Sequence, residues 1–279
     1  MVEIFLIAGC QRTGTTLMRM ILESHSMIRC FDETLAYSAL AKEEYAAPSN
    51  AKLIGLKIPR WTEQLTEPTL RDLGLDVECP NFYRGQKIIF LLRNVKDTVA
   101  SMVKLKFGTE SWLETWGKPI LDWKIQQNDK FRMRFHDEIE KLKSSPEQLV
   151  AAGALYWKYK TLSYFDYCNK RFRVHGVRYE TLVTNPEPVL QSVCGFLGVP
   201  WERQLLNHAQ LPHGELSKNG LAIGNTDPLK PIHRESVGQW KRFFNDLQAS
   251  EIMRIAGDVE TLLERIDLLS LPESRPEPD

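Results

Sequence analysis

Short apolar runs alternate with segments of helical periodicity along much of this chain. The runs at 4–8, 51–59 and 87–92 suit strands that are buried on both faces, and 171–180 predicts a fourth strand. The segments with helical spacing lie at 17–22, 98–103, 148–170 and 189–197. Strands that alternate with helices imply right-handed crossovers between parallel strands. The pattern therefore predicts an α/β fold, with a mostly parallel central sheet flanked by helices.

The pattern weakens between the third and fourth predicted strands. Residues 107–148 hold Trp112, Trp116 and Trp123, and we interpret them as a loop-rich insert that continues into a charged helix at 125–142. Aromatic residues at this spacing are typical of core or interface packing. The alternative is a lid that covers an acceptor, because long loops over a crevice are often functional.

The last third of the chain shows no further strand pattern. A loop rich in Gly, Asn and Asp at 217–230 precedes a final amphipathic helix at 247–266. The tail 271–279 has a disordered composition. Since there is no repeat and no long linker, we expect one domain over 1–270.

The first apolar run leads into a glycine-containing loop with the sequence Gly9-Cys10-Gln11-Arg12-Thr13-Gly14-Thr15-Thr16. Strand, glycine loop and helix N-terminus together form an anion-binding geometry. Gly9 and Gly14 have the spacing of a Walker A loop, but Thr15-Thr16 replaces the Lys-Ser/Thr that would bind phosphate and Mg²⁺. Arg12 carries the charge instead. The loop thus predicts a metal-free phosphate or sulfate site, and the alternative is an ordinary strand-turn-helix connection.

Charged residues also stand near the ends of two other extended segments. Lys57 ends the second apolar run, where a lysine either snorkels to the surface or contacts an anion. Asp32 and Glu33 follow a short extended segment after the first helix. Such a pair is either a helix cap or a general base at a strand end.

Arg93 directly follows the third strand, and Ser101 stands eight residues further along. Both can face the crevice at the carboxyl edge of a parallel sheet, where ligands bind in open α/β folds. The alternative is a surface arginine and an exposed helix serine, with Asp97 acting as a helix cap. Tyr179 ends the fourth strand, and a late basic cluster contains His233, Arg234, Lys241 and Arg242. A solvated basic face is the alternative for that cluster.

The charge and cysteine content narrow the class of protein. Lys+Arg and Asp+Glu both total 36 in 279 residues, so a net charge of zero disfavours nucleic-acid and membrane-surface binding. Apolar runs fall short of the ~20 residues of a membrane span, and the first residues lack a basic signal-peptide start. The five cysteines lack metal-ligand spacing: Cys10, Cys30, Cys79, Cys168 and Cys194. We therefore expect a soluble cytoplasmic protein without a metal site.

Taken together, these motifs resemble the sulfotransferase family that uses 3′-phosphoadenosine-5′-phosphosulfate (PAPS). The loop at 12–16 is similar to the family's 5′-phosphosulfate loop, and Arg93 with Ser101 resembles its 3′-phosphate motif. Tyr179 with its following residues resembles a nucleotide-contacting segment, and 236–241 resembles a late loop that closes over the donor. The resemblance implies a P-loop-like fold, PAPS as donor, PAP as product and no required metal.

Within that family the chain is most similar to the tyrosylprotein sulfotransferase type. The resemblance implies Glu33 as catalytic base and Lys57 as catalytic lysine, with Arg12 assisting and Asn225-Thr226 near the donor sulfate. Arg234 or Lys241 is expected to add to the 3′-phosphate contact.

The chain departs from that type at three places. Gly55 stands opposite Cys30 where the family pairs two cysteines, Leu35 replaces an arginine, and the insert has no clear counterpart. The acceptor therefore stays open among a carbohydrate, a small molecule and a peptide tyrosine, and so does assembly as a homodimer. The rival functions are a P-loop small-molecule kinase and a nucleotide-binding regulatory module.

Overall fold

A computed structural model of the chain describes residues 3–33, 35–36, 51–63, 87–170, 172–214, 216, 220–222 and 224–270. Its main sheet contains five parallel strands in the order β2-β3-β1-β4-β7. These strands are β1 (Glu3–Gly9), β2 (Ile28–Phe31), β3 (Leu53–Lys57), β4 (Lys87–Leu92) and β7 (Arg173–Arg178). The predicted α/β fold with a mostly parallel sheet is confirmed.

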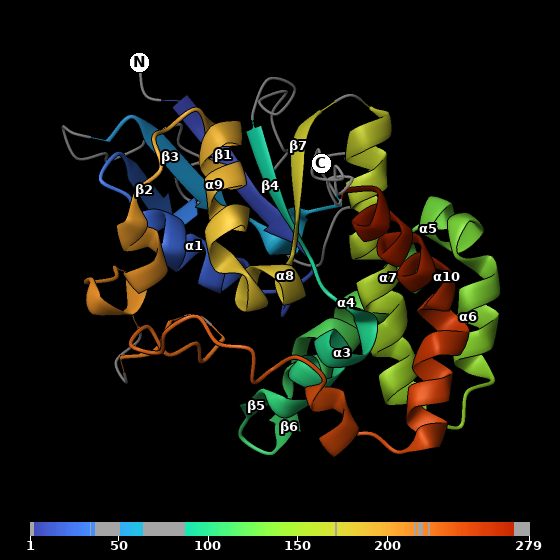
Figure 1. Cartoon of the computed structure of the whole chain (residues 1–279). Coiled ribbons are helices and arrows are strands. Elements are labelled where there is room, and N and C mark those ends of the chain that lie inside the picture. Colours follow the sequence, from blue (N-terminus) through green and yellow to red (C-terminus); the bar gives the residue numbers. More distant parts are fainter. Residues whose placement is uncertain are drawn as a thin grey trace, which may run out of the picture.

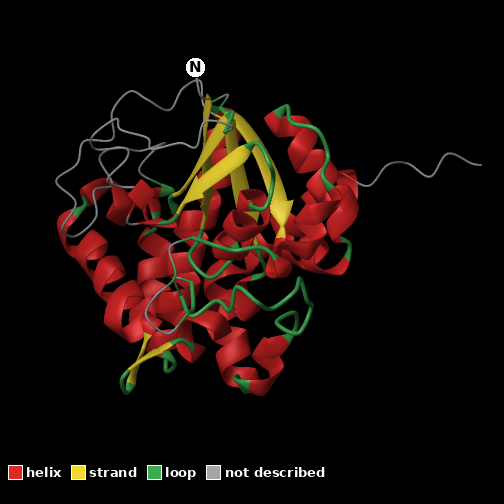
Figure 2. Cartoon of the chain, turned by 90° about the vertical axis from the view of Figure 1, so that its left-hand side faces the viewer, coloured by secondary structure: helices red, strands yellow, loops and turns green. Residues whose placement is uncertain are grey.

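Helices cover both faces of this sheet, as Figures 1 and 2 show. One face packs against α1 (Thr15–Glu23) and α9 (Pro186–Leu197). The opposite face packs against α3 (Val95–Lys104), α7 (Gln148–Asn169) and α10 (Asp246–Ser270). The domain is thus a three-layer α/β/α sandwich.

The sheet separates the hydrophobic core into two clusters by strand alternation. In β1, Leu6 and Ala8 belong to the cluster with α7 and α10, whereas Phe5 and Ile7 belong to the cluster with α1 and α9. Successive side chains of a strand point to opposite faces, so a strand covered on both sides needs an unbroken apolar run. This requirement explains why the first apolar run in the sequence predicted β1 correctly.

The insert at 107–148 contains both helices and connecting segments, but the prediction of one continuous helix at 125–142 is wrong. After the hairpin of β5 (Lys106–Phe107) and β6 (Glu110–Ser111), a π-helix at Leu113–Gly117 leads into three short helices. These are α4 (Lys118–Gln127), α5 (Asp129–Arg134) and α6 (His136–Lys143). The break falls at Asn128, whose extended backbone and side-chain acceptor for the Phe131 N–H begin a new helix.

Several predicted boundaries move by a few residues. Helix α9 begins at Pro186 rather than 189, because proline suits the first helical turn. Helix α10 is longer than the predicted 247–266. The short helix α8 (Tyr179–Thr184) follows β7, and 3₁₀ helices lie at Pro59–Trp61, Arg203–Gln210 and Gln239–Arg242. The predicted disordered tail, 271–279, lies outside the described residues.

Because all five strands are parallel, their carboxyl ends meet at one edge of the sheet. The residues that follow them are therefore neighbours in space although they are far apart in the sequence. This edge holds the glycine loop after β1, Asp32 and Glu33 after β2, Lys57 at the end of β3, Arg93 after β4 and Tyr179 after β7.

Candidate active site

The glycine loop after β1 has a backbone with positive φ angles at three of its residues. Gly9 and Gly14 have φ angles of 134° and 100°, where side chains are strained, and Arg12 is left-handed at 72°. A Cβ atom at Gly14 would lie 2.5 Å from the Tyr179 ring, so the loop closely approaches the first residue of α8. Helix α1 begins directly after the loop, at Thr15, and directs its N-terminus into the same space. The loop is therefore shaped to receive an anion.

The Arg12 guanidinium joins three segments across the mouth of this loop. Its Nε donates to Ser101 Oγ at 3.1 Å, and its Nη1 donates to the Gly224 carbonyl at 3.0 Å. Burial, followed by the nearby charge of Arg93, lowers the pKa of Arg12 to about 10. The group therefore stays charged at neutral pH. Thr13, by contrast, faces inward, where its hydroxyl donates to the Cys10 carbonyl at 2.6 Å.

Arg93 is nearly enclosed, with 4% of its surface exposed. It donates to the Arg12 carbonyl at 2.9 Å and to the Ser236 carbonyl at 2.7 Å. Its guanidinium lies 4.3 Å from the centre of the Tyr179 ring, and the Tyr179 hydroxyl is 2.5 Å from Ser236 Oγ. The structure therefore brings Arg93, Ser101 and Tyr179 together around the loop, as the sequence predicted.

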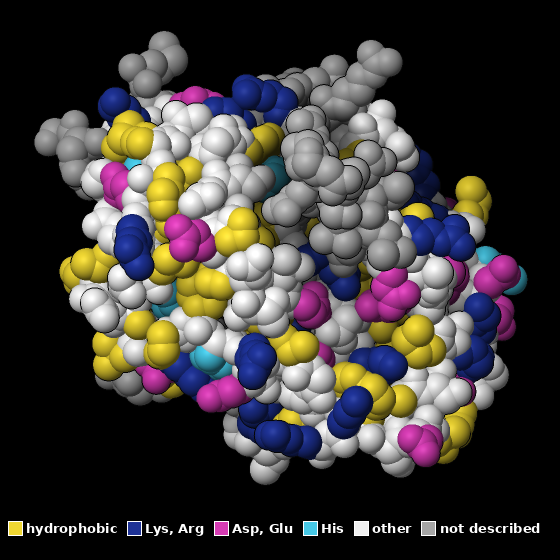
Figure 3. All heavy atoms as spheres, in the orientation of Figure 1, with side chains coloured by type: hydrophobic (Ala, Val, Ile, Leu, Met, Phe, Trp, Pro, Cys, Tyr) yellow, Lys and Arg dark blue, Asp and Glu magenta, His cyan; other side chains and the backbone are white. Residues whose placement is uncertain are grey.

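A cavity of about 690 Å³ opens between these groups, and we call it the donor cavity. Its lining includes Arg12, Gly14, Thr15, Thr16, Arg93, Ser101, Tyr179, Asn225 and Thr226. Lys104, Lys106 and Lys230 line it as well. Lys and Arg side chains also gather on the lower part of the molecule in Figure 3, where α3 and β5 lie in Figure 1. The cavity is thus a polar, cationic space suited to an anionic ligand.

The structure places the predicted late-loop cations elsewhere. Arg234 and Lys241 are exposed and are not among the residues that line the donor cavity. Instead, Lys241 lies over the Trp240 ring at 6.0 Å. Lys230, in the same late segment, lines the cavity together with His233. In a long loop, tertiary contacts decide which side chains face the cavity. The charge content of the sequence therefore predicted that this segment supplies a cation, but not which residue supplies it.

Sequence reasoning missed Lys104 and the role of Asp97. Lys104 follows Ser101 by one helical turn on α3, and that spacing was a usable signal. Asp97 is buried and accepts hydrogen bonds from the backbone N–H groups of Gly238 and Trp240, at 2.7 and 3.0 Å. Asn94, not Asp97, caps α3. Asp97 therefore clamps the late loop at 236–240 onto α3.

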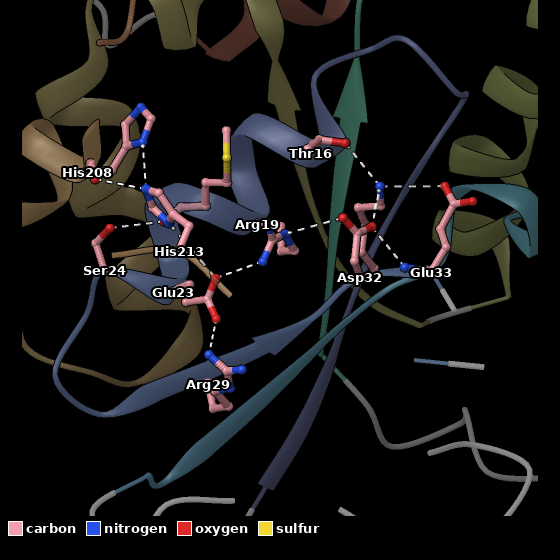
Figure 4. Close-up of polar contacts among 11 residues, drawn as sticks. Thr16, Arg19, Glu23, Ser24, Arg29, Asp32, Glu33, His208 and His213 are labelled. Atoms are coloured by element: carbon pink, nitrogen blue, oxygen red, sulfur yellow. Dashed lines mark hydrogen bonds and ion pairs between the residues drawn. The ribbon is translucent and has the colours of Figure 1, made fainter. Parts of the chain in front are cut away.

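The acids after β2 and the lysine at the end of β3 meet beside Thr16 of the glycine loop, and Figure 4 shows how Asp32, Glu33 and Thr16 lie. Lys57 is 1% exposed, so its interpretation as a snorkelling surface residue is wrong. Its Nζ lies 2.6 Å from Asp32 Oδ1, 3.0 Å from Thr16 Oγ1 and 3.6 Å from Glu33 Oε1. Glu33 is a quarter exposed, whereas Asp32 is fully buried. Glu33 is therefore the carboxylate of this group that a ligand can reach.

A second cavity of about 210 Å³, which we call the acceptor cavity, is also lined by residues of the glycine loop. Glu33 and Lys57 line it at the polar end. Its apolar wall comprises Pro59, Leu105, Phe107, Trp112, Trp116 and Ile120. The two cavities share Arg12, Thr15, Thr16, Leu105 and Gly224, so they adjoin at the glycine loop. The insert thus forms one wall of this cavity through Trp112 and Trp116, while Trp123 is not among its lining residues.

The register of β2 and β3 places Cys30 opposite Gly55. A Cβ atom at Gly55 would lie 2.7 Å from Cys30 Sγ and 2.5 Å from the Phe5 ring. The thiol thus occupies space that a side chain at Gly55 would need. Cys30 is buried, like Cys10 and Cys194.

Two kinds of feature are absent from the described residues. They contain no group of three or more His, Cys, Asp or Glu side chains that could hold a metal ion. None of their helices is long and apolar enough to cross a membrane.

Known proteins that resemble this chain are sulfotransferases. The family described as "Sulfotransferase domain" matches residues 3–264. Protein-tyrosine sulfotransferase 2 of Gallus gallus is 24% identical over 84% of this chain, and the match covers 62% of the relative. A putative protein-tyrosine sulfotransferase of Caenorhabditis briggsae is 21% identical over 99% of this chain and 92% of the relative. The chain therefore spans less than two thirds of the chicken relative but most of the nematode one.

Two solved structures share the fold. The sulfotransferase domain from the curacin biosynthetic pathway superposes with a TM-score of 0.60 at 19% identity, covering 93% of this chain and 98% of that one. The sulfotransferase domain of the Synechococcus PCC 7002 olefin synthase gives 0.52 at 15% identity, over 92% and 94%. With the family match over nearly the whole length and this shared fold, the chain belongs to the sulfotransferase domain family.

Proposed function

We propose that this protein transfers a sulfuryl group from PAPS to an acceptor hydroxyl. The observation that carries the proposal is the meeting of two cavities at the glycine loop, with Glu33 and Lys57 beside the junction. One cavity is polar and cationic, and the other has an aromatic wall. In-line transfer needs a donor and an acceptor on opposite sides of the transferred group, and this arrangement supplies both sides.

The donor cavity offers a distinct contact for each anionic part of the nucleotide. The loop backbone, the N-terminus of α1, Thr15 and Thr16 hold the 5′-phosphate. Arg93 and Ser101 bind the 3′-phosphate, because a guanidinium matches phosphate geometry. Tyr179, Asn225 and Thr226 complete the site, and Lys104 and Lys230 replace Arg234 and Lys241 as the additional cations.

In this mechanism Glu33 accepts the proton of the acceptor hydroxyl, since a neutral hydroxyl is a weak nucleophile. The acceptor oxygen then forms a bond to sulfur as the bond between sulfur and the 5′-phosphate oxygen breaks. The electron pair of the broken bond stays on that phosphate oxygen, and PAP leaves. Lys57 and Arg12 neutralise the charge that develops on the sulfuryl and bridging oxygens.

The acceptor class is set by the walls of the acceptor cavity. Phe107, Trp112 and Trp116 offer flat apolar surfaces that suit a ring, either of a small molecule, of a carbohydrate or of a peptide tyrosine. The relatives named as protein-tyrosine sulfotransferases support the tyrosine option. Leu35, which replaces the family's arginine, weighs against it. The buried free thiols of Cys10 and Cys194 support a cytoplasmic, reducing location.

A P-loop small-molecule kinase is not favoured, because the loop carries Thr15 where a Walker A lysine would stand. A regulatory module without catalysis would need the donor cavity but not Glu33 or Lys57. The proposed reaction also runs without a metal. Treatment with EDTA should therefore leave turnover unchanged.

The experiment that tests the proposal is a turnover assay of Glu33→Gln with radiolabelled PAPS and a panel of peptide, carbohydrate and phenol acceptors. We expect turnover to fall on the order of a hundredfold or more, the range for loss of a general base, with PAP affinity retained. Glu187→Gln, an exposed glutamate on α9, is the matched control and should behave as wild type. Normal turnover by Glu33→Gln would refute the base assignment, and failure of the wild-type protein with every acceptor would favour the regulatory module.

A further inference from the structure

A chain of alternating charges leads from Lys57, which lines the acceptor cavity, to the partly exposed Arg29. Figure 4 shows its members Asp32, Arg19, Glu23 and Arg29. Lys57 pairs with Asp32, and Asp32 Oδ2 faces Arg19 Nε at 3.7 Å. Arg19 in turn donates to Glu23 Oε2 at 2.7 Å, and Glu23 also pairs with Arg29. Each member of the chain therefore has a neighbour of opposite charge on every side.

The inner members of this chain of charges are almost completely shielded from solvent. The side chains of Lys57, Asp32 and Arg19 are 1%, 0% and 0% exposed, whereas that of Arg29 at the outer end is 30% exposed. Charges removed from water in this way are retained only when partners compensate for the lost hydration. Loss of the Asp32 charge would leave Lys57 and Arg19 facing each other without the carboxylate between them.

Asp32 Oδ1 accepts two hydrogen bonds that concern the proposed chemistry directly. One comes from Lys57 Nζ at 2.6 Å and the other from the backbone N–H of Glu33 at 2.8 Å. A single carboxylate oxygen thus fixes both the lysine and the backbone of the base. Asp32 itself is buried and does not line either cavity.

Arg19 connects this carboxylate to the element that receives the phosphate. It lies on α1, three residues after Thr16, so both share one side of the helix. Thr16 Oγ1 accepts from Lys57 Nζ at 3.0 Å, which closes a ring of contacts through Lys57, Asp32, Arg19 and α1. The helix that begins the donor site and the lysine at the acceptor side are therefore held in one fixed relation.

We propose that Asp32, held in place by Arg19, is a positioning residue that directs the Lys57 ammonium toward the donor sulfuryl group. The inference rests on the proposed function, because that function supplies the sulfuryl group with which Lys57 interacts. Asp32 acts through Lys57 and Glu33 and touches neither substrate. Its removal should therefore affect the sulfuryl contact and leave the nucleotide contacts of Arg93 and Ser101 intact.

The test compares the affinities of PAPS and PAP, which differ only in the sulfuryl group. Calorimetric titration is made with wild type, Asp32→Asn, Lys57→Met and the double variant. We expect Asp32→Asn to weaken PAPS binding about tenfold, the scale of one charge-assisted hydrogen bond, and PAP binding less than about twofold. The double variant should bind PAPS no more weakly than Lys57→Met alone, because Asp32 acts through that lysine.

Glu23→Gln is the control for a merely structural role. Glu23 is a buried carboxylate of the same chain of charges, paired with two arginines, but three ion pairs separate it from Lys57. We expect it to lower the melting temperature as Asp32→Asn does while the ratio of the PAPS and PAP affinities stays at the wild-type value. Asp32→Glu, which keeps the charge, serves as the second variant if Asp32→Asn fails to fold, and should change that ratio by less than tenfold.

Three outcomes would overturn the inference while leaving the proposed function standing. They are equal losses of PAP and PAPS affinity in Asp32→Asn, additive losses in the double variant, and a ratio in Glu23→Gln that shifts as much as in Asp32→Asn. Lys57→Met that binds PAPS as tightly as wild type would also overturn the inference. Wild-type protein that binds neither nucleotide would instead overturn the proposed function and this inference with it.

Discussion

At the scale of single residues, the site is built from charges that are withdrawn from water. Lys57 and Arg93 keep only 1% and 4% of their surface exposed, and each is surrounded by fixed acceptors. Such groups reorganise little when a ligand binds, so their fields act at close to full strength. Their residue types and strand-end positions could be read from the sequence. Their partners could not, because Ser236 and Gly224 come from distant loops.

A buried carboxylate outside the site gives a pH-dependent stability. Glu260 on α10 accepts from the Val95 N–H at 2.9 Å, at the start of α3. Burial raises the pKa of Glu260 to about 7, while Arg178 opposes the shift and Glu180 and Glu264 add to it.

The sign follows from which state holds the proton. Between pH 4.5 and 7 the unfolded chain has lost the Glu260 proton and the folded chain has kept it, so stability falls as pH rises and levels off above 7. Glu260→Gln lacks this titration and keeps an acceptor for the Val95 N–H. We expect its free energy of unfolding, relative to wild type, to gain on the order of 2–3 kcal/mol between pH 5 and pH 8.

Urea unfolding at both pH values measures this difference. Glu187→Gln, an exposed glutamate on α9 that does not act on Glu260, is the control and should track wild type at both. A constant offset between Glu260→Gln and wild type from pH 5 to pH 8 would show that Glu260 titrates normally in the folded state.

At the scale of elements, helix α3 holds the late loop as well as Ser101. Asp97 accepts from two backbone N–H groups of that loop, and the amide of Asp97→Asn has a single oxygen for both. We expect Asp97→Asn to weaken PAP binding about tenfold, the scale of one hydrogen bond to a charged group, because Ser236 is no longer held near Arg93. Calorimetric titration with PAP measures the loss.

Hydrogen exchange provides the complementary readout for the late loop. Amides at 236–241 should exchange faster in Asp97→Asn than in wild type, since the clamp on that segment is weakened. Asp246→Asn, at the exposed start of α10, is the control for removal of a carboxylate near the same loop. Wild-type PAP affinity together with wild-type exchange in Asp97→Asn would contradict the clamp.

The elements themselves divide into those that the sequence predicts and those that it does not. The strands β1, β3 and β4 are predictable because burial on both faces imposes a continuous apolar run. The insert is not, because α4, α5 and α6 are short helices whose ends depend on local caps such as Asn128. Their packing on α7 supplies stability that periodicity cannot reveal, including the buried pairing of Lys124 and Lys160 with Glu63.

At the scale of the whole molecule, the site has two adjoining halves, one cavity for the donor and one for the acceptor. The donor side draws on the loop, α3 and the late segment, while the acceptor side draws on the insert. Substitutions should therefore fall into two kinetic classes, one affecting the donor and one the acceptor.

Trp116 belongs to the acceptor class, since it is 47% exposed and lines only the acceptor cavity. We expect Trp116→Ala to raise the KM for an aryl alcohol such as 4-nitrophenol about three- to tenfold, in keeping with a lost aromatic contact, and to leave the PAP Kd unchanged. Trp123→Ala, from the same insert but outside the cavity lining, is the control. A weaker PAP Kd without a change in KM would place Trp116 on the donor side.

The fold and the donor loop could thus be predicted from the sequence, and the late-loop cation could not. Parallel strands bring their carboxyl ends to one edge whatever their loops do, which is why Arg12, Arg93 and Tyr179 were predictable. The path of the late segment depends on its contacts with Asp97 and Arg93. Lys230 therefore lines the donor cavity, although Arg234 and Lys241 had the stronger sequence signal.

The contacts of Arg12 also determine when the active site can be completed during synthesis of the protein. Its left-handed backbone is surrounded by Arg93, Ser101 and Gly224, which lie 81, 89 and 212 positions later in the chain. During synthesis the first strand and its loop emerge from the ribosome long before these partners exist. The sheet can assemble while the loop waits, but the site is complete only once the chain beyond Ser236 has emerged. A chain that stops before these partners therefore contains the whole loop but lacks the residues that close it.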